Sequence, residues 1–377
     1  MASTKIAVYG LSTEGYSIAC QMAVKGADVF IVDESAHMAI SLKAEIAKTY
    51  PNVTSLKEDE PLLGVEPIDV AISRSEYLFF SPRIRKTGQE AKMEIHSKFK
   101  DATSSIKKGG SVIYNLPTGI GGNNETISLL EHITGLEMGK GISYFYYPLT
   151  KNQSPDMIGS FNGKTDDKLA KLLEVDKKPK KFVSIASSEI LHAVRILTQF
   201  ASLASILEVC KFAQDPVTRN DLIFTDYKDL FLDDIANGLY DLRSLGTSVE
   251  GAGTMMYLVN GSIKGIEGYV KRLIDEIRST LKKNELKASR TRVVLVWTQD
   301  PYEMRGDKVD MLSSLVTKLR DYIGDVEVHQ GPSLDLFHSD KTTIIVACSK
   351  LDYDKIVKNG KDSDLIIIKT NPLCEIL

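Results

Sequence analysis

Residues 5–33 read KIAVYGLSTEGYSIACQMAVKGADVFIVD, and their order of apolar runs and glycines predicts the fold of the N-terminal part of the chain. Residues 5–10 are a short apolar run that ends at Gly10, a pattern typical of a buried parallel strand. A helical pattern follows and stops at Gly26, which suits a helix C-terminus. Residues 29–33 then form a second strand. Strand, glycine-bounded turn, helix and strand in this order predict a βαβ unit with parallel strands.

The turn after the first strand, GLSTEG, has two of the three glycines of the Gly-x-Gly-x-x-Gly loop of dinucleotide-binding folds. Gly10 and Gly15 are present, and Ser12 stands at the second glycine position. Ser12 adds bulk where a diphosphate needs clearance, although its hydroxyl could donate to phosphate, and Glu14 adds a negative charge nearby. Asp33 closes the second strand, where a carboxylate accepts from a ribose 2′-OH and repels the 2′-phosphate of NADP. The pattern predicts NAD binding, with an empty or altered site as the alternative.

Further apolar runs extend the α/β pattern to about residue 148. We predict strands at 68–72, 77–80 and 111–116, an amphipathic helix near 89–107, and an apolar, aromatic segment at 142–148. The aromatic residues of that last segment and the glycines after 116 favour a ligand crevice at the carboxyl ends of the strands.

The middle third of the chain has helical periodicity only. From Ser187 to Ala213 one long face is apolar, and more helices are predicted at about 221–245 and 263–283. The C-terminal part returns to alternating elements. We predict a strand at 293–297, a helix near 308–323, and strands at 326–329, 342–347 and 364–368.

These patterns predict an α/β protein in three parts. An N-terminal Rossmann-like, doubly wound domain spans 1–185, an all-helical central domain with long helices spans 186–285, and a smaller C-terminal Rossmann-like domain spans 286–377.

Composition excludes several classes of partner. The net charge is −3, with 47 basic and 50 acidic residues, so no global field attracts nucleic acid. No stretch approaches the ~20 apolar residues that a membrane span needs, and the N-terminus passes directly into a strand without a signal sequence. The four cysteines are scattered without a CxxC pair, and the six histidines lack metal-ligand spacing. We therefore expect a cytoplasmic protein with free thiols, no metal, no nucleic acid and no membrane.

The order of segments resembles the UDP-glucose/GDP-mannose dehydrogenase family over nearly the whole chain. Residues 10–33 are similar to the family's glycine loop, helix and acid-tipped strand. Other similar segments are Glu60-Pro61-Leu62-Leu63 (family Glu-Pro-x-Leu), EYLFFSPR with Ser81-Pro82 (Val-Pro-Thr-Pro), KKGGSVIYNLPTGIGG with Pro117-Thr118-Gly119 (Ser-Thr-Val-Pro-Pro-Gly-Thr), GLEMGKGISYFYYP, RVVLVWTQDPYEMRGDK, TTIIVACSKLDYDKI and DLIIIKTNPL.

The resemblance implies sites as well as a fold. It implies an NAD site made by Gly10, Ser12, Gly15, Asp33, Ser81, Pro82 and Thr118. It also implies substrate contacts at Arg305, which in the family reaches a neighbouring subunit's substrate, and at Gly253. A sugar nucleotide is the small-molecule partner it implies. Family members dimerise through the long central helix, so a homodimer is expected.

The family's catalytic cysteine is missing. The family holds its intermediate as a thioester in Gly-Gly-x-Cys, and the corresponding residues 251–256 read GAGTMM. A methionine thioether cannot form such an adduct, and Cys210 lies in a helical pattern that reads as core. The family's four-electron oxidation is therefore not expected.

Other family positions have changed too. Leu149 stands where the family has the glutamate of Ser-Pro-Glu-Arg. His192, Arg195 and Gln199 lie where the helix should carry a lysine and an asparagine. His192 as a base and Arg195 as an anion contact are the catalytic candidates, with a structural role on an amphipathic helix as the alternative.

Three functions remain open. The first is an NAD-dependent oxidoreductase that makes a single hydride transfer on a sugar nucleotide or another alcohol. Alternatively, it is an inactive relative whose cofactor or sugar-nucleotide binding is regulatory, or a scaffold with a vestigial site. The first is favoured slightly because Asp33 and the loop glycines are present.

Overall fold

The computed structural model describes residues 3–51, 64–86, 88–150, 155–175, 178–209, 230–249, 251, 253–332, 342–359 and 366–370. Cys210, Cys374, Ala252 and the Glu-Pro-x-Leu-like segment 60–63 lie outside this description. The chain divides into two compact units. Unit 1 comprises 1–195, 247–249 and 300–306, and unit 2 comprises 196–246, 250–299 and 307–377. The three-part division expected from the sequence stays a prediction.

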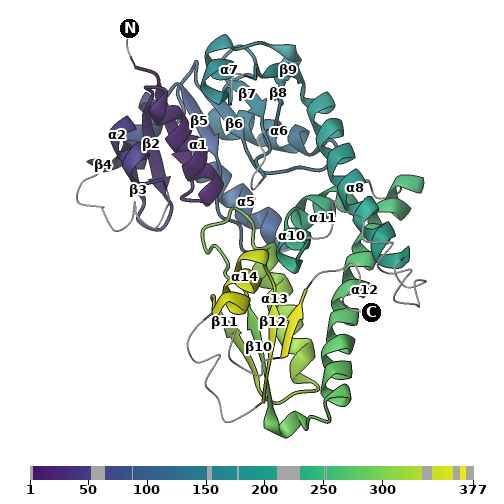
Figure 1. Cartoon of the computed structure of the whole chain (residues 1–377). Coiled ribbons are helices and arrows are strands. Elements are labelled where there is room, and N and C mark those ends of the chain that lie inside the picture. Colours follow the sequence, from purple (N-terminus) through teal and green to yellow (C-terminus); the bar gives the residue numbers. More distant parts are fainter. Residues whose placement is uncertain are drawn as a thin grey trace. The chain divides into compact units, whose positions relative to one another are not determined.

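Unit 1 is built on a nine-stranded, mostly parallel sheet, so the predicted α/β class with a Rossmann-like N-terminal part is confirmed. Its order is β4-β3-β2-β1-β5-β6-β7-β8-β9 (purple to teal in Figure 1). The strands are β1 (Lys5–Tyr9), β2 (Asp28–Asp33), β3 (Met38–Leu42), β4 (Gly64–Pro67), β5 (Tyr77–Phe80), β6 (Ser111–Tyr114), β7 (Ser143–Tyr146), β8 (Met157–Ser160) and β9 (Lys181–Ser184). β1 pairs in parallel with both β2 and β5, and the predicted βαβ unit is confirmed.

The predicted strand at 68–72 is wrong. Those residues lie in α4 (Ile68–Arg74), whose buried residues are Ala71 and Ile72. Ile68, Ala71 and Ile72 have helical spacing, and a five-residue segment with four apolar residues does not distinguish a buried strand from one helical face. The strand beside β2 is instead β3, which pairs antiparallel with β2 and with β4.

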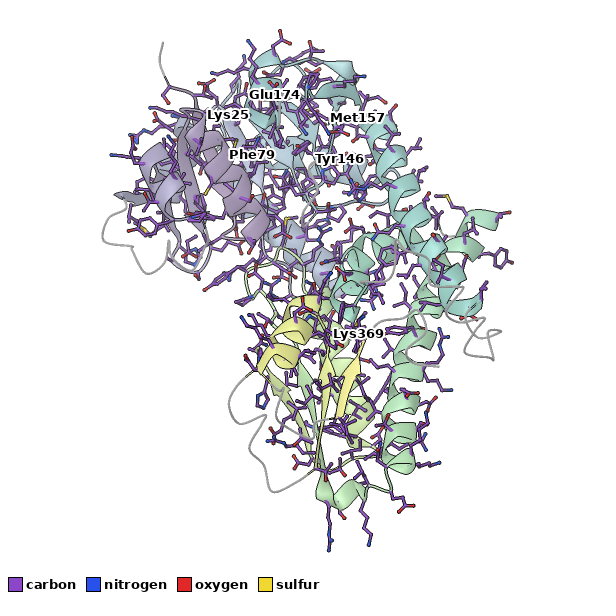
Figure 2. The ribbon with its side chains drawn as sticks, viewed as in Figure 1. Lys25, Phe79, Tyr146, Met157, Glu174 and Lys369 are labelled. Carbon is purple, nitrogen blue, oxygen red and sulfur yellow. The ribbon has the colours of Figure 1, made fainter. Side chains whose placement is uncertain are left out.

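Helices lie between most consecutive strands of unit 1. They are α1 (Thr13–Val24), α2 (Ala44–Thr49), α5 (Gly88–Thr103), α6 (Gly122–Thr134), α7 (Asp167–Leu173) and the short 3-10 helix η2 (Phe161–Gly163). The core is the sheet itself, where Phe79 of β5 and Tyr146 of β7 are fully buried (Figure 2). Lys25 at the end of α1 donates to the carbonyl of Glu174 after α7, which ties the two helix ends together (Figure 2).

Unit 2 contains a parallel sheet in the order β11-β10-β12-β13 (green to yellow in Figure 1). Its strands are β10 (Thr291–Val296), β11 (Val326–His329), β12 (Thr342–Ala347) and β13 (Ile366–Lys369). Its helices are α10 (Leu232–Ala236), α11 (Leu239–Ser248, ending in unit 1), α12 (Thr254–Lys283), α13 (Asp307–Arg320), α14 (Lys350–Asn359) and the 3-10 helix η5 (Ala288–Arg290). The predicted second Rossmann-like part and the helices before it are confirmed in the described residues.

α8 (Ile185–Val209) is the long central helix that the sequence predicts. Within the described part of the chain it is the one helix that is long and apolar enough, by length and composition alone, to cross a membrane. The expectation that no segment comes near that threshold is therefore too strict. Its inward face includes the buried residues Ala193 and Phe200, as in the core helix of a globular protein.

Candidate functional site

The residues predicted to form the dinucleotide loop meet at the carboxyl ends of β1 and β5. Gly10 has φ +104°, and a Cβ atom there would lie 2.4 Å from the carbonyl oxygen of Ser81 and 2.6 Å from Cα of Pro82. Only glycine allows this approach of two strand ends. Ser12 Oγ donates to the Ser81 carbonyl at 2.7 Å and accepts from the Gly15 amide at 3.0 Å. The loop geometry of a dinucleotide-binding fold is therefore in place.

Ser12 acts as the N-cap of α1. Its backbone is extended, and its side chain accepts from an amide in the first turn, as N-cap residues do. Ser12 is fully buried, and its hydroxyl proton is directed to Ser81. The hydrogen bond to phosphate considered from the sequence is therefore replaced by a structural bond within the loop.

The first turn of α1 is hydrogen-bonded to a segment from far along the chain. The amide of Thr13 donates to the carbonyl of Tyr302 at 2.7 Å, and Thr13 Oγ1 donates to Asp300 Oδ2 at 2.5 Å. Residues 300–306 follow β10 in sequence but belong to unit 1. The positive end of the helix, where a diphosphate would bind, is thus in contact with a peptide carbonyl and a carboxylate of the protein.

Glu14 fixes the same segment. Its Oε2 accepts from the amide of Met304 at 2.8 Å. Burial raises the pKa of the Glu14 carboxyl, and Glu303 raises it further, whereas Arg305 and the amides of Glu14 and Met304 lower it. The side chain therefore places an acidic group beside the amides that would otherwise meet a phosphate.

This arrangement does not fit a dinucleotide diphosphate. The amides of Thr13 and Gly15 already donate to Tyr302 and Ser12, and two acidic side chains, Glu14 and Asp300, lie at the same helix end. A phosphate would have to displace the 300–306 segment and would meet like charge.

Asp33 lies where the sequence places it, at the end of β2 beside the loop. The amide of Gly10 donates to the carbonyl of Val32 at 3.1 Å, which holds the loop against β2. Asp33 is buried, and its Oδ1 accepts from the amide of Ser35 at 3.0 Å and from Ser35 Oγ at 2.6 Å. One carboxylate oxygen of Asp33 therefore stabilises the tight turn into β3.

Thr118 belongs to a second group of buried polar residues, after β6. Its amide donates to Tyr146 Oη at 3.1 Å, and its Oγ1 accepts from Asn123 Nδ2 at 2.8 Å. Glu189 of α8 caps α6 by accepting from the amides of Gly121 and Asn123 at 2.8 and 3.0 Å. Each of these contacts positions an element, and the helix end that follows Thr118 also has a protein carboxylate bound to it.

The aromatic residues of segment 142–148 are structural. Tyr144, Tyr146 and Tyr147 are at most 1% exposed, and Tyr144 Oη donates to Asn123 Oδ1 at 2.6 Å. They belong to the core of the sheet and form no aromatic crevice for a ligand.

Of the remaining predicted residues, Arg195 and Arg305 contact adjacent residues of one loop, whereas Gly253 lies elsewhere. His192 and Arg195 lie on α8, His192 is buried, and Arg195 donates to Thr150 Oγ1 at 3.4 Å. Arg305 is buried in unit 1 and donates to the carbonyl of Leu149 at 2.8 Å. Gly253 precedes α12 and belongs to unit 2, where a Cβ would meet no atom within 4 Å. The roles of these four residues stay predictions.

The carboxyl end of the second sheet is also covered by the chain. Asp233 of α10 accepts from Trp297 Nε1 at 2.8 Å, and its Oδ1 lies 2.6 Å from Lys308 Nζ. The Asp233 amide donates to the Cys348 carbonyl at 3.0 Å, just past β12. α10 therefore packs over the strand ends at which open α/β sheets bind ligands.

Sequence reasoning missed the residues that cover these positions. Asp233 has no motif around it. Asp300 and Tyr302 lie in the family-like segment RVVLVWTQDPYEMRGDK, but only contacts distant in sequence give these two residues a role. Glu14 was the one sequence feature that indicated a covered helix end. An acidic residue in the first turn stabilises the helix N-terminus, so this helix end does not need an external anion. Among the described residues, no group of three or more His, Cys, Asp or Glu could hold a metal ion.

Comparison with known proteins gives a fold and no close relative. No protein-family model matches the chain, and no curated protein matches it by sequence. Solved structures do match. A UDP-D-ManNAc dehydrogenase from Pyrococcus horikoshii is 15% identical with a TM-score of 0.62, covering 99% of this chain and 96% of that one. A UDP-glucose dehydrogenase from Pyrobaculum islandicum is 12% identical with a TM-score of 0.61, covering 98% and 95%.

A third match agrees. The UDP-N-acetyl-mannosamine dehydrogenase of S. aureus is 12% identical with a TM-score of 0.57, covering 99% of this chain and 100% of that one. These likenesses extend over whole chains at low identity, so the fold is that of a nucleotide-sugar dehydrogenase. The expected resemblance is confirmed at the level of fold.

Proposed function

We propose that this protein is a catalytically inactive relative of the nucleotide-sugar dehydrogenases that acts as a scaffold. The hydrogen bond from the Thr13 amide to the Tyr302 carbonyl carries this proposal, because it fills the position where a cofactor diphosphate would bind. The covering of the second sheet by Asp233 and α10 supports it, since that edge is the other ligand position of the fold.

Thiol chemistry supports the same conclusion. Residues 251–256 offer no cysteine, and the two cysteines among the described residues are free thiols in other places. Burial raises the pKa of both the Cys20 and the Cys348 thiol, so neither is a ready thiolate nucleophile. Unpaired thiols also support the proposed reducing, cytoplasmic setting.

The test is calorimetric titration of the purified protein with NAD, NADP, UDP-glucose and GDP-mannose, followed by a hydride-transfer assay on each nucleotide sugar. We expect no dinucleotide binding at concentrations up to about 1 mM, and no NADH formation. NADH formation with any of these substrates would refute the inactive assignment. Sugar-nucleotide binding without turnover would instead favour a regulatory binding protein over a scaffold.

An NAD-dependent oxidoreductase is the second candidate. Asp33 favours it, because a buried carboxylate at the end of β2, beside a loop that keeps Gly10 and Gly15, is the arrangement that recognises an NAD ribose. If NAD binds, Asp33→Ala should weaken it about tenfold or more, while Asp28→Ala at the exposed start of β2 should not. Equal affinities would remove the ribose contact from this candidate.

We also propose that the scaffold is a homodimer formed through α8. Ile190, Leu191 and Val194 lie on the outward face of this helix, each between 45% and 55% exposed. The other exposed residues from Ser187 to Ser205 on this helix are uncharged as well. A charge-free apolar face on a long helix fits a self-complementary interface between two copies.

A further inference from the structure

We infer that residues 300–306 act as a strap that keeps a dinucleotide-type diphosphate site closed, and that the loop under the strap can bind a diphosphate when the strap lifts. The inference rests on the proposed function in one respect, namely that the closed form is not a working dehydrogenase. The inference adds a regulatory role for the contact between the strap and the first turn of α1, which the fold alone does not require.

Residues Ile84 and Arg85, in the loop after β5, hold the strap by hydrogen bonds. Arg85 Nη2 donates to the carbonyls of Pro301 and Glu303 at 2.7 and 2.8 Å, and Nη1 donates to the carbonyl of Ile84 at 3.1 Å. The Ile84 amide donates to the Met304 carbonyl at 2.8 Å. A single guanidinium thus binds two carbonyls of the strap, and hydrogen bonds from a charged donor are stronger than neutral ones.

The strap also has its own internal order. Asp300 Oδ1 accepts from the Tyr302 amide at 2.8 Å, which forms a turn that presents the Tyr302 carbonyl to α1. Arg83 lies over the Tyr302 ring at 5.6 Å from its centroid. At the other end, Arg305 is anchored on Leu149, outside the strap.

The Tyr302 carbonyl takes the place of a phosphate oxygen. It accepts from the Thr13 amide, at the helix end whose partial positive charge favours an anion. A carbonyl oxygen carries only a partial negative charge, so a diphosphate would interact more strongly with the same amide once the strap had moved away. Asp300 and Glu303 would leave with the strap, while Glu14 stays on α1.

The loop under the strap keeps two features of a dinucleotide-binding loop. Gly10 still allows the close approach of two strand ends, and Ser12 still orders the first turn of α1. Neither feature depends on a strap residue. The strap therefore covers an ordered loop and does not replace it.

Arg85→Gln tests the inference, with Arg85→Lys as a milder variant and Lys86→Gln as the matched control. Lys86 is the next residue, and its exposed side chain pairs with Glu90 at 3.8 Å. Both glutamine variants lose one positive charge, which by itself would weaken anion binding. Stronger anion binding in Arg85→Gln could then come only from the lifted strap.

Two measurements are needed on the full-length chain. Hydrogen exchange should show the Thr13 and Met304 amides protected in the wild type, and at least about tenfold faster in Arg85→Gln. Calorimetry with inorganic pyrophosphate and with NAD should show binding by Arg85→Gln, weaker binding by Arg85→Lys, and none by the wild type or Lys86→Gln.

Three outcomes would overturn the inference: unprotected Thr13 and Met304 amides in the wild type, equal pyrophosphate affinity in all variants, or faster exchange in Arg85→Gln without binding. In the last case the proposed inactive function would still stand. Hydride transfer by the wild type would refute that function whatever the strap variants do.

Discussion

The amide of Thr13 donates to the carbonyl of Tyr302 at 2.7 Å, so the first turn of the first helix is bonded to a residue beyond the tenth strand. In a dinucleotide-binding fold this amide is a phosphate ligand. Here a neutral peptide group satisfies it, and the protein needs no bound anion to complete the helix end. The fold of a nucleotide-sugar dehydrogenase is thus compatible with a closed cofactor position.

Replacing Gly10 tests the loop geometry. Gly10→Ala should lower the free energy of unfolding by about 3 kcal/mol or more, because the new Cβ would lie 2.4 Å from a backbone oxygen and φ is +104°. Gly26→Ala is the control, with φ +89° and no atom within 4 Å of a Cβ. It should cost only about 1 kcal/mol. Urea denaturation measures both, and equal losses would contradict the close approach.

Glu14 should make stability depend on pH. Burial raises its pKa in the folded state above the ordinary value of 4.5, so the folded protein binds a proton more tightly than the unfolded chain. The protonated Glu14 carboxyl therefore contributes stability that is fully present below pH 4.5. This contribution is lost as the pH rises through the raised pKa.

Glu14→Gln removes that loss and keeps an acceptor for the Met304 amide. The variant should therefore melt about 2 °C or more above the wild type at pH 7, with the difference shrinking toward pH 4. Glu45→Gln, which changes an exposed acid in the first turn of α2, should leave the melting temperature nearly unchanged. A Glu14→Gln variant that melts lower at pH 7 would show that the carboxylate stabilises the strap.

Asp233 should be critical for unit 2. Asp233→Ala removes the acceptor of Trp297 Nε1 and the carboxylate 2.6 Å from the buried Lys308 ammonium. The loss should be about 3 kcal/mol, as for removing one partner of a buried ion pair. Asp275→Ala, in an exposed pair with Arg278, should cost less than about 1 kcal/mol.

Adding Lys308→Met distinguishes the contribution of the Asp233–Lys308 ion pair from that of the hydrogen bond between Trp297 and Asp233. The double variant Asp233→Ala/Lys308→Met should be more stable than Asp233→Ala alone, because no buried cation would then lack its carboxylate. Additive losses in chemical denaturation would mean that the two side chains do not interact.

Val194→Glu should separate the proposed dimer. A carboxylate on the outward face of α8 would have to be buried in the interface, while in a monomer it is solvated. Light scattering after size-exclusion chromatography should give a dimer for the wild type and a monomer for the variant, with unchanged circular dichroism. Met93→Glu, at another exposed apolar residue, should remain dimeric. A monomeric wild type, or one that binds lipid vesicles through α8, would contradict the proposal.

Much of the fold could be predicted from periodicity. Buried parallel strands such as β1, β10 and β12 have continuous apolar runs, and α8 and α12 are long enough for their apolar faces to be unambiguous. Short elements were harder. α4 has only two buried residues, and β3 is an antiparallel strand next to a parallel one, so tertiary contacts decided both.

The candidate site could be predicted only in part. Gly10, Ser12 and Gly15 are close in sequence, so their loop was visible, and Ser81 was implied by the family resemblance of EYLFFSPR. Tyr302 could not be found in this way, because its contribution is a main-chain carbonyl, which any residue has. A sequence therefore predicts a site well when its contacts come from particular side chains. It predicts a site poorly when main-chain groups occupy the ligand position.

The order of synthesis gives the strap one more consequence. Unit 1 needs residues 300–306, but its other main portion ends at residue 195. A ribosome takes on the order of 10 s to add the roughly 100 residues between them. During that interval the chain lacks the Tyr302 carbonyl that accepts from the Thr13 amide. The first turn of α1 therefore has no internal acceptor for this amide until residue 302 has been made.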